Sequence, residues 1–391
     1  MAEKEIKIEK IKAKLLYKFS NQFYACGKND DLIPIGKRRA IAFTNNPCAD
    51  NDDIGLLAAY IDKNCIGYIG MMPGWIRIKN TINKVYWLST WYVPPKFRKS
   101  SVGISLIIEA RSLNYDLIVC GMSKIAQKVY KALRFKQLGV LNYYQIRLYL
   151  LDPVNLAFRL IRKIVRHWKE QFDIPYWLIQ ISKPIYYPIY KLLYKSILNS
   201  LKIYLDDVMY KEVSEVSEHL STGKNSKPVE FFRNHEIINW MLKYKWTTTK
   251  DELEKGDYNY FFAEIRDAFI FTALEVYPKR DRSRKGFMIL SVSIDNLDII
   301  LKILDFRFSN AEDYDYILPI AFKYANDHLA NIIEIPNELY EHLPANRIVR
   351  FVIQKRERTY LIYPKSDKSP LHKLDKNNLD LSYCDGDTAF T

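Results

Sequence analysis

Between residues 84 and 135 the alternation of apolar and polar residues predicts strands and helices in turn. The apolar and aromatic run Val85–Val93 is typical of a half-buried strand. Pro94 and Pro95 end this strand, because neither residue can donate a ladder hydrogen bond. A short basic and serine-rich turn then leads into the next predicted element.

Two helices and one more strand complete this segment. Apolar residues recur at helical spacing over Val102–Ala110 and again over Ser123–Leu133. The short continuous apolar run Leu117–Cys120 lies between them and predicts a buried strand. The order of strand, turn, helix, strand and helix is typical of ligand-binding α/β units.

The turn before the first helix has a composition suited to an anion. It reads Arg98-Lys99-Ser100-Ser101-Val102-Gly103. Unpaired N–H groups and the positive end of the following helix would attract an anion. Arg98 would add a charge-assisted bond, and Gly103 would let a bulky group approach the backbone. Ser101 as a helix cap and Arg98 as a surface cation are the structural alternatives.

Over about the first 150 residues the chain resembles the GNAT acetyltransferase superfamily. The family signature (Arg/Gln)-x-x-Gly-x-(Gly/Ala) corresponds here to Arg98-x-x-Ser101-x-Gly103, with a serine in place of the first glycine. The later family motif Asn-x-x-Ala-x-x-x-Tyr-x-x-x-Gly-Phe corresponds to Ser123, Ala126, Tyr130, Arg134 and Phe135. Serine replaces asparagine and arginine replaces glycine in that second motif.

The resemblance implies an α/β fold with a mixed sheet and acetyl-CoA as cosubstrate, without a metal. An amine would attack the thioester directly, with no covalent enzyme intermediate. Tyr130 would be the general acid, although a core ring is the alternative for a tyrosine on an apolar helix face. The cofactor-binding residues that the resemblance implies are Tyr92, Val93, Arg98, Lys99, Ser100, Ser101, Val102, Gly103 and Ser123.

Each part of the cofactor would then meet a different element. The pyrophosphate would bind the backbone of Lys99–Gly103, and the pantetheine arm would pair with the strand edge Thr90–Val93. The general base stays open, because the strand before the turn carries no carboxylate. A water chain, a carboxylate of Asp50–Asp53, or Glu264 could serve. Trp87 and Trp91 would line an acceptor pocket or belong to the core.

The remaining pattern predicts three parts. Strands at Leu56–Ile61, Cys65–Met72 and, after a Pro73-Gly74 turn, Trp75–Ile78 complete a first domain, residues 1–151. Residues 152–213 form a basic connector with one apolar stripe. The stripe residues are Val154, Ala157, Phe158, Ile161, Val165, Trp168 and Phe172, and Ile174–Tyr190 would suit an interfacial excursion. This stripe would lie on an anionic membrane or pack against protein.

Residues 214–391 predict a second domain that echoes the first. A helix follows Pro228. The predicted strands are Tyr260–Ile265, Ala268–Tyr277 and Phe287–Ile294, the helices Asp295–Asp305 and Tyr314–Asp327, and the hairpin Ile348–Gln354 with Thr359–Tyr363. This order favours a degenerate GNAT-like copy that shapes the acceptor side, and an unrelated α+β domain is the alternative. It lacks a basic glycine turn and should hold no second cofactor.

Composition limits the cellular compartment and the kinds of partner that the sequence predicts. The 391 residues suggest two domains, and lysine and arginine exceed aspartate and glutamate by 14, which favours anionic partners. Five scattered cysteines without a C-x-x-C pair indicate reduced thiols in a cytoplasm and no zinc site. No apolar signal or spanning segment is evident. Walker A, G-x-G-x-x-G, G-x-S-x-G and His-x-x-x-Asp motifs are absent from the sequence.

Three functions compete on this basis. The first is a cytoplasmic, acetyl-CoA-dependent N-acetyltransferase acting on a small-molecule amine such as an amino sugar or envelope precursor, with peripheral contact to an anionic membrane. The second is a Fem-type aminoacyl transferase that uses tRNA, against which the cofactor turn argues, so a nucleic-acid partner is not expected. The third is a non-catalytic membrane-surface adaptor. The oligomeric state stays open.

Overall fold

A computed structural model of the protein describes residues 5–26, 32–152, 156–157, 159–161, 188, 191–218, 228–254, 256–283, 285–308, 310–343, 346–374 and 379–390. The chain divides into two units, each built from segments that are distant in the sequence. Unit 1 comprises Met1–Leu141, Ser214–Arg266 and Glu357–Thr391, and unit 2 comprises Asn142–Val213 and Asp267–Arg356.

The sheet of unit 1 begins as an antiparallel meander. Its strands are β1 (Lys7–Lys12), β2 (Ile54–Ile61), β3 (Asn64–Ile78), β4 (Thr81–Tyr92), β5 (Leu117–Val119), β8 (Val229–Phe231), β15 (Ile353–Tyr363) and β16 (Leu379–Asp380). β1 to β4 pair in order, and β4 then pairs in parallel with β5. β15 is antiparallel to β5. β8 pairs with one end of β3 and with β16, so C-terminal segments complete this sheet.

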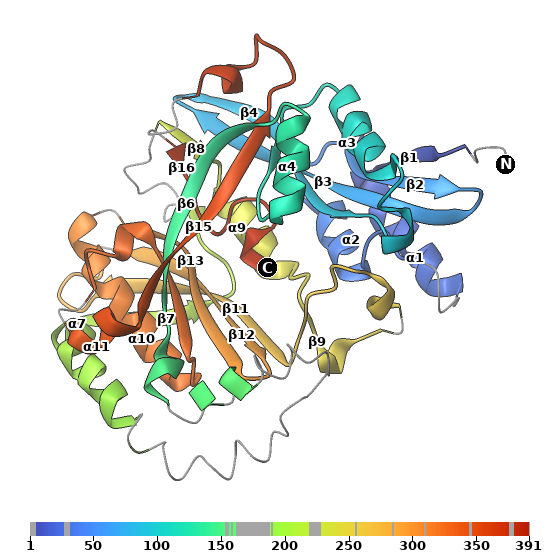
Figure 1. Cartoon of the computed structure of the whole chain (residues 1–391). Coiled ribbons are helices and arrows are strands. Elements are labelled where there is room, and N and C mark those ends of the chain that lie inside the picture. Colours follow the sequence, from blue (N-terminus) through green and yellow to red (C-terminus); the bar gives the residue numbers. More distant parts are fainter. Residues whose placement is uncertain are drawn as a thin grey trace. The chain divides into compact units, whose positions relative to one another are not determined.

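Helices cover both faces of β2 and β3, with α3 (Val102–Ser112) on one side and α1 (Leu16–Cys26) with α2 (Lys37–Thr44) on the other (Figure 1). Alternate residues of β4 face opposite sides. Tyr86 and Leu88 join the core beneath α3 and α4 (Lys124–Ala132), whereas the ring of Trp87 packs 4.5 Å from that of Phe231. The unit also contains α9 (His235–Lys243) and a parallel pair, β9 (Thr248–Thr249) with β10 (Ile265–Arg266).

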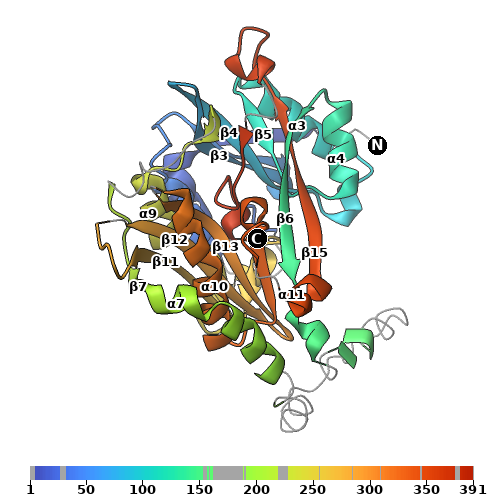
Figure 2. The ribbon, with the colours of Figure 1, turned by 90° about the vertical axis from the view of Figure 1, so that its left-hand side faces the viewer.

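Unit 2 has its own sheet and core. Its elements are β6 (Lys136–Ile146), β7 (Val208–Val213), β11 (Ala268–Pro278), β12 (Gly286–Asp295), β13 (Asp298–Phe308), β14 (Ile332–Pro336), α7 (Lys202–Asp207), α10 (Ile317–Asp327) and α11 (Arg347–Val352). β7, β11, β12 and β13 are antiparallel neighbours, β13 is parallel to β14, and β14 is antiparallel to β6. Figure 2 shows α10 and α7 in front of β11 to β13.

The two units repeat one topology. In each, a four-stranded antiparallel meander leads through a helix to a parallel strand, and that strand pairs antiparallel with a strand that is distant in the sequence. The boundary between the units falls inside β6 and β15. The last strand of each half of the chain therefore pairs within the unit formed mainly by the other half. The predicted α/β fold with a mixed sheet is confirmed, and the second half does echo the first in strand order.

The units divide the chain differently from the predicted ranges 1–151, 152–213 and 214–391. Residues 214–266 and 357–391 belong to unit 1 because β8, β15 and β16 pair there. Such pairings join residues over 100 positions apart, which local patterns do not encode. Stripe residues Val154, Phe158, Val165, Trp168 and Phe172 and the segment 174–187 lie outside the described residues. Both interpretations of the connector therefore stay predictions.

Some predicted elements are corrected by the structure. Asp295–Asp305 is mostly strand β13 rather than a helix, Ile348–Gln354 is mostly helix α11 rather than a strand, and Tyr260–Ile265 is largely irregular. β3 continues through the predicted Pro73-Gly74 turn, where Pro73 faces Tyr86. The first two errors share one cause, because short apolar runs fit helical and strand periods alike and long-range pairing decides between them.

Candidate functional site

Strand β4 is irregular just before the predicted cofactor turn. Its register against β3 shifts, so that Thr90 and Trp91 together face Ile69, which is a β-bulge. Thr90 has a φ of 53°, in the left-handed region that β-branched residues rarely adopt. Pairing with β5 ends at Leu88, whereas β4 continues to Tyr92. The two parallel strands therefore part, and β4 extends past β5 on this side.

The turn after β4 is open to solvent and has unpaired donors. Within the described ranges, the backbone N–H groups of Lys99, Ser101, Gly103 and Ile104 donate to no protein acceptor. The side chains of residues 98–101 are exposed, so none fills the bend. Because α3 begins at Val102, these N–H groups lie at the positive end of a helix. The turn has the donors that a diphosphate needs.

The other predicted residues of the turn also have local structural roles. The Arg98 Nε donates to the Val93 carbonyl at 3.1 Å, and the Ser100 hydroxyl donates to the Phe97 carbonyl at 2.7 Å. Val102, the first residue of α3, is fully buried. A Cβ on Gly103 would lie 3.0 Å from the ring of Trp91. Glycine is therefore needed here for packing as well as for access to the backbone.

Tyr130 is the buried residue of α4 and belongs to the core that α3 also covers, and only 2% of it is exposed. Its ring meets those of Trp91, 5.5 Å away, and Phe135, 4.9 Å away, edge to face. Burial raises the pKa of its hydroxyl well above the usual value. That hydroxyl has no hydrogen-bond partner among the described residues, and its oxygen is not among the completely buried polar atoms that lack a partner. The oxygen therefore keeps its access to solvent.

Ser123 and Tyr92 are placed by the fold for other reasons. The Ser123 hydroxyl caps α4 by accepting the N–H of Ala126 at 3.2 Å. The ring of Tyr92 stacks on Phe261 at 4.1 Å between centroids. Any contact that Tyr92 makes with a cofactor would therefore involve its backbone. Neither residue's predicted role in cofactor binding is tested by these contacts.

The carboxylates proposed as general base are engaged elsewhere. Asp53 accepts the Tyr86 hydroxyl at 2.5 Å and the Lys84 ammonium at 2.6 Å, and Asp50 pairs with the same lysine. Glu264 accepts a bond from Arg266 at 2.7 Å. Each of these carboxylates therefore already has a cationic partner in the structure.

Buried polar atoms without hydrogen bonds gather at the irregular end of β4, on residues that the sequence did not single out. Among the described residues they include Ser89 Oγ, Trp91 Nε1, Tyr68 OH, Tyr260 OH and Arg39 Nε. Buried polar atoms are normally paired with protein or with ordered water. These unpaired atoms indicate that a polar ligand or water binds here. Their common position depends on contacts between distant segments, so no local pattern could have revealed it.

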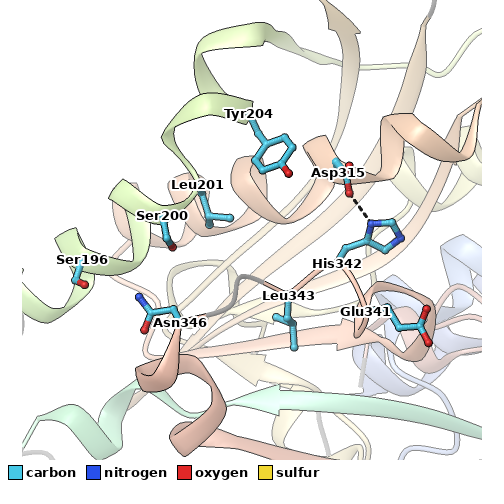
Figure 3. Close-up of a pocket in the computed structure, with 9 residues that line it drawn as sticks. All are labelled: Ser196, Ser200, Leu201, Tyr204, Asp315, Glu341, His342, Leu343 and Asn346. Atoms are coloured by element: carbon cyan, nitrogen blue, oxygen red, sulfur yellow. Dashed lines mark hydrogen bonds and ion pairs between the residues drawn. The ribbon is translucent and has the colours of Figure 1, made fainter.

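A separate cavity of about 530 Å³ lies in unit 2 (Figure 3). Its lining includes His342, whose Nδ1 lies 2.7 Å from a carboxylate oxygen of Asp315. Ser200 is on the helical wall, and its hydroxyl donates to the Ile197 carbonyl of the same helix at 2.6 Å. The serine is therefore not paired with the histidine as an activated nucleophile would be. The cavity shows a His–Asp pair but no complete catalytic arrangement.

Two general features can be stated for the part of the chain that the structure describes. No group of three or more histidine, cysteine, aspartate and glutamate side chains is arranged to hold a metal ion. No helix in these ranges combines the length and apolarity needed to span a bilayer.

No family model matches the chain, and no curated protein sequence matches it. Among solved structures it is similar to a GCN5-related N-acetyltransferase from Anabaena variabilis, at 9% identity over 93% of this chain and 73% of that chain, with a TM-score of 0.46. It is also similar to Saccharomyces cerevisiae N-myristoyltransferase with bound myristoyl-CoA, at 7% identity over 93% and 83%, with a TM-score of 0.47. Eis1 from Mycobacterium abscessus matches at 10% identity over 91% and 73%, with a TM-score of 0.44. Chains this distant often differ in function.

Proposed function

We propose that this protein is an acyl-CoA-dependent N-acyltransferase that transfers an acetyl group from acetyl-CoA to a primary amine. The observation that carries the proposal is the pair of features at the end of β4. One is the set of unpaired N–H groups at the start of α3. The other is the strand edge left where β4 extends past β5. A diphosphate followed by an extended, amide-bearing arm fits these two features in order.

The residues present have the properties that the reaction requires. Lys99, Ser101, Gly103 and Ile104 would hold the diphosphate through their N–H groups. The edge of Ser89–Tyr92 offers backbone groups to the pantetheine amides. Bound acetyl-CoA supplies an activated acyl group on a good leaving thiolate. Tyr130 carries a proton that this thiolate can take, although burial raises the pKa of the phenol and makes it a weaker acid than an exposed tyrosine.

Calorimetric titration with CoA tests the proposal directly, and two variants at one position sharpen it. Ser101 has a φ of −74°, which proline also adopts, so Ser101→Pro removes one N–H donor with little change of that angle. Ser101→Ala removes only the hydroxyl and is the matched control. A hydrogen bond to a charged group contributes about 1.5–3 kcal/mol, so S101P should weaken CoA binding roughly tenfold or more. S101A should bind nearly as the wild type does.

Equal affinities for S101P and S101A would show that the backbone of the turn does not hold the diphosphate. Thermal unfolding of both variants checks that proline leaves the fold intact. A parallel titration with tRNA separates the main alternative, because an aminoacyl transferase of the Fem type would bind tRNA. A wild-type protein that binds tRNA and no CoA would contradict the proposal.

A further inference from the structure

The C-terminal segment returns to β4 in unit 1. Gly386 has a φ of 67°, in the left-handed region that favours glycine, and a Cβ there would lie 2.8 Å from the ring of Trp87. The backbone therefore passes against the face of β4 that carries Trp87. Asp387 is the next residue after this contact.

Asp387 is partly paired and partly free. One oxygen of its carboxylate accepts the Arg39 guanidinium at 3.3 Å, and no bond to the other oxygen is found among the described residues. The side chain of Arg39 is 3% exposed, and the side chain of Asp387 is 17% exposed. The Arg39 Nε has no partner either, and the guanidinium lies over the ring of Trp246. The arginine thus fixes the carboxylate while leaving it able to accept another hydrogen bond.

Two buried groups near these strands have pKa values that the charge of Asp387 affects. Burial raises the pKa of the Cys120 thiol, and the Asp387 carboxylate raises it further. Burial also raises the pKa of the Tyr260 hydroxyl. The charge of Arg39 and a contact with Thr90 lower this pKa, and the charge of Asp387 raises it. Cys120 directly follows β5, and Thr90 lies in the bulge of β4. Trp87, against which Gly386 packs, pairs with Ile118 of β5, and this pairing ends one residue later at Leu88. Asp387 therefore follows a residue that packs beside the last paired residues of the two strands.

We propose that Asp387 binds the ammonium group of the acceptor and removes its proton, so that the acceptor is a cationic primary amine. The proposal rests on the proposed acyltransferase function. A proton passes from R–NH₃⁺ to the free carboxylate oxygen. The neutral nitrogen then bonds to the acyl carbon, the carbon–sulfur bond breaks, and the thiolate takes a proton from Tyr130. The nitrogen gives up a second proton to solvent, and solvent reprotonates the tyrosine and accepts the proton from Asp387.

The two proposed proton-transfer groups lie on opposite faces of β4. Tyr130 contacts Trp91 on the α3 face of β4, whereas Asp387 follows the glycine that packs on Trp87 on the other face. Donor thiolate and acceptor amine can therefore approach the parted strands from opposite faces. Tyr260, Tyr68 and Ser89 add unpaired buried polar atoms to the acceptor side.

Asp387→Asn tests the role, because asparagine has the same shape and can still accept the Arg39 bond. Acetyl-CoA would be offered with glucosamine, spermidine and a tripeptide with a free N-terminus, and thiol release would be followed with and without amine. General-base catalysis contributes about 10²–10⁴-fold, so D387N should lower kcat about 100-fold or more. Calorimetry should give an unchanged affinity for CoA. Asp367→Asn, at a fully exposed side chain in the same segment, should behave as the wild type.

Asp387→Glu guards against a folding defect, since it keeps the charge beside Arg39 and moves the carboxylate by one methylene. It should fold and still lose about tenfold in kcat. The proposal is overturned if D387N or D387E turns over as fast as the wild type does. It is also overturned if no amine is acylated and acetyl-CoA is only hydrolysed slowly, at a rate that D387N does not change. Wild-type protein that fails to bind CoA overturns the proposed function itself. If the wild type binds CoA and acylates an amine but the Asp387 variants do the same, only the inference about Asp387 is removed.

Discussion

Tyr130 shows how one side chain can be a core residue and a candidate acid at once. Its ring fills the space between Trp91 and Phe135, which is the structural role that the sequence left open. The hydroxyl oxygen is not completely buried, and it has no hydrogen-bond partner among the residues that the structure describes. Burial raises the pKa of the phenol, which keeps it neutral but also makes it a weaker acid than an exposed tyrosine.

Tyr130→Phe keeps the ring and removes the proton. We expect kcat to fall about 100-fold, in the range of general acid catalysis, with the affinity for CoA unchanged. Steady-state kinetics and calorimetry check the two quantities. Tyr204→Phe, at a residue that lines the cavity in unit 2, is the control and should have no effect on either. A Y130F variant with normal turnover would leave Tyr130 as a core ring alone.

At the scale of elements, the sequence was most informative where spacing is local. The strand Val85–Val93, the turn and the two helices after it are found as β4, α3 and α4. The bulge at Thr90 and the parting of β4 from β5 could not be predicted, because they depend on registers with β3 and β5. Asp387 was missed for the same reason, since nothing in its own segment indicates Trp87 or Arg39 as neighbours.

Ser123→Ala distinguishes the two roles assigned to the start of α4. Loss of an N-terminal cap costs about 1 kcal/mol, so the free energy of unfolding should fall by that amount in a denaturant titration. Asn234→Ala removes the matching cap of α9, where the side chain accepts the Ile237 N–H at 3.1 Å. Both variants should lose similar stability. An additional loss of CoA affinity in S123A alone would show that Ser123 also contacts the cofactor.

At the scale of the whole molecule, the C-terminal segment is fastened into unit 1 by buried charges. Arg233 pairs with Asp385 at 2.5 Å, and the Ser382 N–H donates to the same carboxylate at 2.6 Å. Burial nevertheless outweighs these partners and raises the pKa of Asp385 from 3.8 to about 7. A buried pair of this kind fixes where a segment lies more than it stabilises the fold.

The stability of the protein should therefore depend on pH through Asp385. Between the unfolded value near 3.8 and the folded value near 7, the folded state binds the additional proton. The free energy of unfolding contributed by this group is thus greatest below pH 3.8 and is lost as the pH rises through about 7. Thermal unfolding at about pH 5 and about pH 8 should show a smaller difference in Asp385→Asn than in the wild type. Equal differences would contradict the shift.

Because β5 is completed by residues 361–363 and β8 by Leu379–Asp380, synthesis imposes an order on the two units. A nascent chain in which β5 has been made exposes an unpaired strand edge until residues 361–363 have also left the ribosome. Such edges invite misassembly and are a reason for chaperones to engage a growing polypeptide. The sheet of unit 1 can therefore close only after Asp380 has been made, and any activity of this unit would begin only after that point in translation.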